Sequence, residues 1–343
     1  MFTVPVLDIS PYRAPGAHAG ASAECARVAA ELDSACREVG FVQITGHGVP
    51  DAVIDGLGAA LDTFFGLPLE AKKAYRRPGE NRGYSPPKSE SLSRSLGITT
   101  AMNDFYESFT VGSERSWYAD PDLPEASYAD NTWPDAASTF RPAVERYFAE
   151  VRTLSRTLLR VFTDALGLPQ GYFDGMTGRS IDALKMNNYA LPEGEAVAGE
   201  VLGMGAHTDF GILTVLWADR VPGLQVLDTD GVWHDVQPAE GAFLVNLGDA
   251  MARWTNDRWL STVHRVDPPV VGGSIVRRRS AAFFFDGDHD AVIETLPGCA
   301  DTASPGYPPI TIAENIAMKV AGLKGTGAVS TPLRETDRVR AAR

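Results

Sequence analysis

Cysteine is scarce in this chain, with three residues (Cys25, Cys36 and Cys299) among 343 and no Cys-x-x-Cys pair. An odd and sparse set does not provide the paired framework of a disulfide-stabilised protein. Cys25 and Cys36 lie on the apolar stripe of a predicted helix, where we expect small core residues rather than a disulfide.

Long apolar runs are also absent. No segment approaches the roughly 18 consecutive apolar residues of a membrane-spanning helix. The amino terminus does not show the basic-then-apolar order of a signal peptide. We therefore expect a cytoplasmic protein that does not bind membranes.

Positive charge is in short supply, because 31 lysine and arginine residues face 44 acidic residues, for a net charge of −13. With a pI of about 4.9, the chain is a poor partner for nucleic acid or an anionic membrane. Its 44% hydrophobic and 22% charged residues are typical of a globular protein. We expect a small-molecule partner, and a monomer or weak homodimer.

Hydrophobic periodicity predicts several helices. Apolar residues recur every three or four positions across residues 22–39, and Gly40 supplies a helix stop. A second helix is predicted from about Asp51. The longest is predicted over residues 141–166, as a scaffold on the outside of a sheet, and one more over residues 312–323.

After residue 180 the pattern changes to short strands separated by glycine and proline turns. Short strands at this spacing indicate a sandwich or barrel, and a metal-binding jelly roll fits. The predicted fold is α+β and mainly β, with a double-stranded β-helix (jelly-roll) core flanked by N-terminal and long scaffold helices. The predicted strands are 183–190, 213–217, 224–227, 232–236, 242–246, 261–266 and 281–285.

No internal repeat or second domain divides the chain. We expect a single domain over residues 1–323, with an N-terminal cap region at 1–120 and the jelly-roll core at about 180–290. Residues 324–343 are polar and lack apolar periodicity, so they are predicted to form a frayed tail.

Three residues of the predicted core have the spacing of a metal site. His207 and Asp209 are two apart, so on a β-strand both side chains leave the same face. His264 follows Asp209 by 55 residues, which leaves enough chain for further strands to fold back beside the first. Two imidazoles and one carboxylate on one side of a metal form the facial triad of non-haem Fe(II) sites that use O₂.

Full reduction of O₂ at such a site needs more electrons than most substrates give. A 2-oxo acid supplies the remainder by oxidative decarboxylation, provided that its far carboxylate is held by a guanidinium and a hydroxyl. Arg278 and Ser280 are two apart in a strand pattern, so both point to one face, whereas Arg279 points the other way. The pair suits the distal carboxylate of 2-oxoglutarate.

Taken together, these motifs resemble the isopenicillin N synthase-like family of Fe(II)/2-oxoglutarate-dependent oxygenases. The likeness covers nearly the whole chain, from residue 4 to about 323. The segments that carry it are 5–10, 40–49, 82–84, 186–189, 207–209, 245–249, 254–257, 261–266 and 278–280.

The resemblance implies roles for individual residues. The implied iron ligands are His207, Asp209 and His264. The implied ligands of the distal 2-oxoglutarate carboxylate are Arg278 and Ser280, with Tyr189 as a phenol donor.

Two polar residues of a further family motif, Asn246 and Asp249, are expected to stabilise a turn rather than to take part in the chemistry.

The resemblance also implies a reaction. With Fe(II), 2-oxoglutarate and O₂, such an enzyme oxidises an unactivated C–H bond of a small molecule and releases succinate and CO₂. The product is hydroxylated, desaturated or cyclised, and fold alone does not choose between these outcomes. A place in secondary metabolism is implied as well.

Further site residues follow from strand alternation. Lys185, Asn187 and Tyr189 alternate in a strand and share the face expected to see the iron. Asn187 is expected to contact the chelating end of 2-oxoglutarate, and Lys185 the substrate. Of the run of phenylalanines at 283–285, we expect Phe285, together with Phe283, to face the pocket.

The segment 78–118 is long and lacks periodicity, so it is predicted to form a wall or lid over the iron. Within it, Arg82, Tyr84 and Phe109 are expected to contact the substrate. A charged group in a lid needs a partner when the lid closes, so Arg82 is expected to meet an acidic group of the substrate.

Three alternatives remain open at this point. An oxidase like isopenicillin N synthase itself would use no 2-oxoglutarate, and its Arg-x-Ser pair would bind the substrate's own carboxylate. A zinc hydrolase would more often use three histidines, or two and a glutamate. A non-catalytic jelly roll would not need the Arg-x-Ser pair beside a complete triad.

The triad makes a direct prediction. Purified protein should bind one Fe(II) per chain, and alanine in place of His207, Asp209 or His264 should abolish turnover because each removes a metal ligand. Iron content and O₂ consumption measure the two effects. A variant that keeps a near-normal rate would remove its residue from the ligand set.

Overall fold

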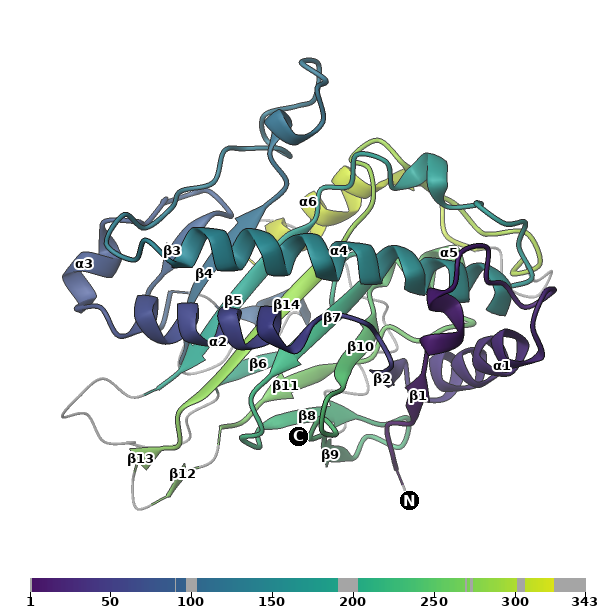
Figure 1. Ribbon diagram of the computed structural model, residues 1–343, viewed down its shortest axis with the longest axis horizontal. Coiled ribbons are helices and arrows are strands. Elements are labelled where there is room, and N and C mark those ends of the chain that lie inside the picture. The colour runs from purple at the N-terminus through teal and green to yellow at the C-terminus, as the bar shows by residue number, and fades with distance from the viewer. Residues whose placement is uncertain are drawn as a thin grey trace.

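Two β-sheets pack against each other, and helices cover the outer side of the larger one (Figure 1). The computed structural model describes residues 2–89, 91–96, 104–190, 203–268, 270–271, 274–300 and 306–323. The predicted frayed tail, residues 324–343, lies outside the described residues.

The first helix forms where the apolar periodicity predicts it. Helix α1 (Ala23–Glu38) begins after Ser22, whose hydroxyl accepts the backbone N–H of Cys25. It ends before Gly40, which has a φ of +70°. A Cβ on Gly40 would lie 2.3 Å from the carbonyl oxygen of Leu260, so this turn requires glycine.

The longest helix, α4 (Phe140–Ala165), runs across the outer face of the larger sheet with α2 (Asp51–Phe65) beside it (Figure 1). Its buried residues form one stripe, as expected for a scaffold helix. No helix within the described ranges combines the length and apolar character needed to cross a membrane. The other helical elements are α3 (Leu69–Lys73), α5 (Asp249–Trp254), α6 (Ile312–Leu323) and the 3₁₀ turns Ser10–Arg13, Leu92–Leu96, Arg115–Trp117 and Asp174–Met176.

The larger sheet has eight strands, of which β1 and β2 pair in parallel and all other neighbours are antiparallel. In spatial order they are β1 (Val6–Asp8), β2 (Phe41–Thr45), β10 (Phe243–Leu247), β7 (Leu213–Ala218), β14 (Arg278–Phe285), β5 (Ala183–Tyr189), β4 (Glu107–Gly112) and β3 (Gly83–Ser85).

The smaller sheet has four strands in the order β6 (Met204–His207), β11 (His264–Val266), β8 (Leu224–Leu227) and β9 (Trp233–Asp235). Two short pairs complete the strands of the described chain: β12 (Val270–Val271) with β13 (Ser274–Ile275), and β15 (Val292–Ile293) with β16 (Ile310–Thr311). Two facing sheets with flanking helices confirm the predicted jelly-roll class.

Alternate residues of the larger sheet enter two different layers. In β14, Ala281, Phe283 and Phe285 belong to the hydrophobic core that α2 and α4 cover. The intervening residues Arg278, Ser280, Ala282 and Phe284 line a cavity. Because successive side chains of a strand point to opposite faces, one residue separates the structural face from the cavity face.

The sequence pattern missed the two strands β3 and β4 at one side of the larger sheet. Both lie in the segment 78–118 that was predicted to be irregular, and all six residues of β4 are buried between β5 and β3. In β4, Ser108, Phe109, Thr110 and Val111 alternate polar and apolar, and Phe109 and Val111 enter the core, so a short strand period was present that the prediction overlooked. The prediction that the whole segment forms a wall or lid is therefore wrong for β4.

The stripe of α4 makes a stability prediction. Leu158 is fully buried in the core, so Leu158→Ala should lower the free energy of unfolding by about 2–5 kcal/mol through lost burial and the cavity left behind. The exposed neighbour Arg156 is the control, and its change to alanine should cost less than about 0.5 kcal/mol. Chemical denaturation measures both, and equal losses would contradict this account of the α4 stripe.

Candidate active site

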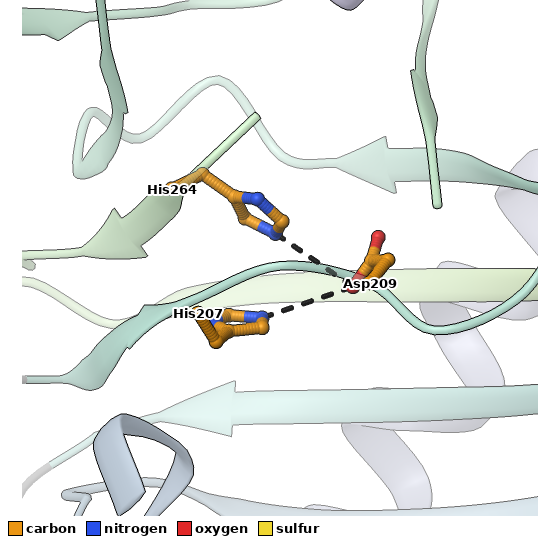
Figure 2. A group of neighbouring side chains, drawn as sticks. All are labelled: His207, Asp209 and His264. Carbon is orange, nitrogen blue, oxygen red and sulfur yellow. Dashed lines mark ion pairs between the residues drawn. The ribbon is translucent and has the colours of Figure 1, made fainter. Parts of the chain in front are cut away.

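The three predicted metal ligands lie at the junction of the two sheets. His207 ends β6, His264 begins β11, and these two residues pair directly across the smaller sheet. Asp209 lies just beyond β6, in the connection to β7. Figure 2 shows both imidazole rings turned toward Asp209, with each Nε2 3.8 Å from its Oδ1. All three residues are buried, and their ligand atoms lie within 4.8 Å of one another.

Backbone carbonyls orient the two imidazoles. Nδ1 of His207 is 2.8 Å from the carbonyl oxygen of Gly205, and Nδ1 of His264 is 3.1 Å from that of Thr262. Nδ1–H therefore donates in each ring, which leaves the Nε2 lone pair directed at the shared centre. Burial, with His264 beside it, lowers the pKa of His207 to about 3, so this ring is neutral and able to ligate at physiological pH.

Two side chains of the larger sheet hold the carboxylate. Thr214 on β7 and Asn246 on β10 each donate a hydrogen bond of 2.6 Å to Oδ2 of Asp209, which leaves Oδ1 for a metal. Burial alone would raise the pKa of Asp209. The nearby His264 and His207 and the two hydrogen bonds outweigh it, so the pKa lies below its ordinary value and the carboxylate is ionised.

A cavity of about 590 Å³ is lined by the three predicted ligands and by Arg278. Arg278 is 1% exposed, and its Nε and Nη1 atoms find no hydrogen-bond partner among the described residues. The ring of Tyr189 lies 5.4 Å from its Cζ. A buried guanidinium without an anion is costly. A guanidinium with two nitrogen atoms that lack a partner fits a carboxylate bound inside the cavity.

Strand pairing brings the other predicted cosubstrate residues to the same place. Register places Ser280 opposite Asn187, and Arg278 opposite Tyr189. Nδ2 of Asn187 donates to Oγ of Ser280 at 3.5 Å, and Oδ1 of Asn187 has no partner in the described structure. Lys185, farther along β5, also lines the cavity.

Three predicted substrate residues lie elsewhere. Tyr84, Phe109 and Phe285 are buried in the hydrophobic core and do not line the cavity. The hydroxyl of Tyr84 donates to Oε2 of Glu107 at 2.6 Å. Phe285 has the same parity as the core residues of β14, so the cavity-facing phenylalanine is Phe284. The expectation of substrate contact is therefore wrong for these three residues.

Arg82 also lies outside the cavity lining. Its Nη1 donates to the carbonyl oxygen of Asn81 at 2.8 Å. A Cβ on Gly112 of β4 would come within 2.3 Å of its Nη2, so the guanidinium packs on that strand. The predicted contact between Arg82 and the substrate is not supported by this position.

The sequence analysis did not predict several residues of the cavity. Asn246 was expected to stabilise a turn, but it positions Asp209 instead. Ile316 and Val320 of α6 line the cavity, and so does Asp286. Burial and the nearby Asp182 raise the pKa of Asp286 well above its ordinary value. Part of the segment 78–118 does contribute a wall, namely residues 78–81, 85, 86, 89, 91, 92 and 94.

Comparison with known proteins decides the family. Residues 4–136 match the family described as non-haem dioxygenase in morphine synthesis N-terminal, and residues 181–287 match the 2OG-Fe(II) oxygenase superfamily. A 2-oxoglutarate-Fe(II) type oxidoreductase, hxnY of Emericella nidulans, is 35% identical over 320 residues, 91% of this chain and 88% of that protein. The chain belongs to the 2OG-Fe(II) oxygenase superfamily.

Other relatives of this oxygenase agree. Validamycin A dioxygenase of Streptomyces hygroscopicus is 30% identical, and the match spans 95% of this chain and 89% of that one. A crystal structure of a 2OG-Fe(II) oxygenase family protein from Caulobacter crescentus is similar, with a TM-score of 0.78, 27% identity and coverage of 93% and 99%. A full-length Neurospora crassa protein in complex with alpha-KG and thymine has a TM-score of 0.76, 27% identity and coverage of 94% and 97%.

These relatives confirm the predicted enzyme class. The protein is a non-haem Fe(II)- and 2-oxoglutarate-dependent oxygenase whose cofactors are Fe(II), 2-oxoglutarate and O₂. The oxidase that dispenses with 2-oxoglutarate is not favoured, and neither is the zinc hydrolase or the non-catalytic jelly roll.

The hydrogen bonds to Asp209 generate a prediction for this oxygenase. Thr214→Val removes one donor at nearly constant shape and should weaken Fe(II) binding about tenfold or more, as loss of such outer contacts commonly does. Anaerobic titration measures the dissociation constant. Thr163→Val on α4 is the control, because Thr163 is also buried but its hydroxyl bonds to Leu159 of its own helix. Unchanged affinity in Thr214→Val would show that Asn246 alone suffices.

Proposed function

We propose that His207, Asp209 and His264 bind one Fe(II) in this oxygenase. Arg278 and Ser280 then bind the distal carboxylate of 2-oxoglutarate. The reaction is the oxidation of an unactivated C–H bond of a small molecule, with release of succinate and CO₂. The observation that carries the proposal is the buried guanidinium of Arg278, whose Nε and Nη1 lack partners among the described residues, in the cavity that holds all three metal ligands.

The chain's residues have distinct tasks in this scheme. Bound iron supplies the redox chemistry with O₂ that the side chains cannot perform. Two imidazoles and one carboxylate hold the metal from one side and leave the other side to 2-oxoglutarate and O₂. Oδ1 of Asn187 has no partner in the part of the chain that the structure describes, and its amide lies beside Ser280 in the cavity, where it orients the cosubstrate.

The guanidinium of Arg278 suits 2-oxoglutarate by its charge. Its Nε and Nη1 have no partner among the described residues and can donate to a bound carboxylate, and the hydroxyl of Ser280 adds a donor. The ring of Tyr189 lies beside the guanidinium of Arg278, and its hydroxyl contacts the sulfur of Met204 at 3.9 Å. Tyr189 also lines the cavity, so the proposal keeps it as a phenol donor to the cosubstrate.

The substrate occupies the remaining part of the cavity, beside Ala183, Lys185, Ala282 and Phe284. An aromatic ring and a lysine suit a substrate with an apolar body and an acceptor or anionic group. The exposed residues Arg76, Arg77, Glu80 and Asn81 form the mouth.

Some further points belong to the same proposal. Relatives from fungi and Streptomyces support a role in secondary metabolism. Three free cysteines, all buried, fit a reducing compartment such as the cytoplasm. A monomer or weak homodimer is expected, and hydroxylation is the default outcome, with desaturation or ring closure as the other outcomes.

The role of Arg278 is tested by replacing it with lysine. A single ammonium cannot reproduce the two-pronged fork, so Arg278→Lys should raise the KM for 2-oxoglutarate about tenfold or more, a factor that corresponds to about 1.4 kcal/mol. Iron affinity should change little. Succinate formation against 2-oxoglutarate concentration gives the value.

Arg279→Lys is the matched control. Arg279 is the next residue of β14 but points away from the cavity, toward Asp62 and Asp219. Its KM for 2-oxoglutarate should match that of the wild type. If Arg278→Lys instead raises only the KM for the substrate and leaves that for 2-oxoglutarate unchanged, Arg278 binds the substrate and the assignment is wrong.

A further inference from the structure

Helix α6 is joined to the metal-ligand segment by a buried ion pair. Lys319 of α6 is 1% exposed and pairs with Oδ2 of Asp249, the first residue of α5. The same carboxylate oxygen accepts the hydroxyl of Thr208 at 3.1 Å. The chain of contacts from α6 thus ends on the residue between His207 and Asp209.

A second set of contacts reaches the other side of Asp209. Nδ2 of Asn315, also on α6 and 2% exposed, donates to the carbonyl oxygen of Phe210 at 2.9 Å. Nζ of Lys319 lies 5.9 Å from the centre of the Phe210 ring. The backbone N–H of Asp249 donates to the carbonyl oxygen of Asp209 at 2.9 Å. Both neighbours of Asp209, and Asp209 itself, are therefore fixed from α5 and α6.

The same helix forms part of the cavity. Ile316 and Val320 line it, and each follows one of the anchoring residues, Asn315 and Lys319, by one position. Residues three and four apart share a face of a helix, so the anchors and the cavity residues form adjacent rows. One helix therefore contacts both the substrate space and the metal-ligand segment.

Electrostatics make this connection specific. A buried ion pair adds little net stability compared with an apolar pair, but removal of one partner leaves a buried charge uncompensated. Separation of Asp249 from Lys319 would leave both charges without a partner, so the pair disfavours other arrangements of α6 on the ligand segment. Thr208, bonded to the same oxygen, is held in that arrangement.

We propose that Asp249 and Lys319 are positioning residues for the metal centre, and that they couple α6, as a wall of the substrate cavity, to the geometry of His207 and Asp209. This inference rests on the proposed assignment of the metal ligands. It predicts that the docking of α6 and the binding of metal strengthen each other, because coupling between two sites is reciprocal.

The first test is metal binding without turnover. Co(II) is the probe, since it is stable in air and its visible absorption reports the ligand geometry. Lys319→Met should raise the Co(II) dissociation constant about tenfold or more and change the spectrum, in line with the loss of other outer contacts.

Lys72→Met is the matched control. Lys72 forms another buried ion pair, with Glu107 at 2.7 Å, which joins α3 to β4. Its loss should lower thermal stability but leave the Co(II) constant and spectrum as in the wild type. If Lys319→Met and Lys72→Met bind Co(II) alike, the positioning role is overturned. If the wild type binds no Co(II), the ligand assignment itself fails.

A double variant distinguishes the loss of the Asp249–Lys319 contact from the effect of leaving the Asp249 charge unpaired. Asp249→Asn with Lys319→Met removes both charges and should fold, yet it should still bind Co(II) as weakly as Lys319→Met alone. Recovery of wild-type affinity would mean that an unpaired carboxylate caused the defect, and would overturn the proposal.

Hydrogen exchange tests the reciprocal effect. Addition of Co(II) to the wild type should slow amide exchange across residues 312–323, and the slowing should be lost in Lys319→Met. Equal slowing in both proteins would show that α6 responds to metal through other contacts, which would also overturn the proposal.

Discussion

The carboxylate of Asp209 connects the two sheets at the candidate active site. Asp209 belongs to the connection that leaves the smaller sheet, and its Oδ2 is held by Thr214 and Asn246 of the larger sheet. Both donors are buried, so the loss of either bond would leave a buried polar group without its partner. The position of one carboxylate oxygen thus ties the segment that carries His207 to the sheet that carries the proposed cosubstrate residues.

Strand alternation distributes the remaining tasks. The outer face of the larger sheet carries apolar side chains that pack under α4 and α2, and the inner face carries the polar and basic groups of the cavity. Since both faces are buried, the register of β14 on β5 cannot slip by one residue without exchanging core and site. The same rigidity that stabilises the sheet therefore holds Arg278 and Asn187 in position.

Charge is distributed unevenly in this acidic protein. The chain carries a net charge of −13, yet the cavity contains Arg278 and Lys185, which suit anionic ligands such as 2-oxoglutarate. A low-dielectric cavity strengthens these local charges relative to distant surface charges, which solvent and salt screen. Local arrangement rather than net charge thus governs what the site binds.

The sequence by itself determined the fold class, the long helices, the residues of the triad and the Arg-x-Ser pair. The helices, the His-x-Asp pair and the Arg-x-Ser pair depend on periods of two or about 3.6 and on short spacings, which are properties of neighbouring residues. His264 lies 55 residues from Asp209, and the family resemblance implied its place in the triad. The sequence could also have shown which alternate residues of β14 face the cavity. If Arg278 and Ser280 face the cavity, then Phe284 must face it and Phe285 must not.

Only the tertiary structure decided the rest. Tyr84 and Phe109 stand beside polar residues in the sequence, but the pairing of β3 and β4 places both in the core. The support of Asp209 by Asn246 joins residues 37 apart, and the link from Asp249 to Lys319 joins two helices. Such contacts follow from how strands and helices pack in space, and no local period in the sequence records them.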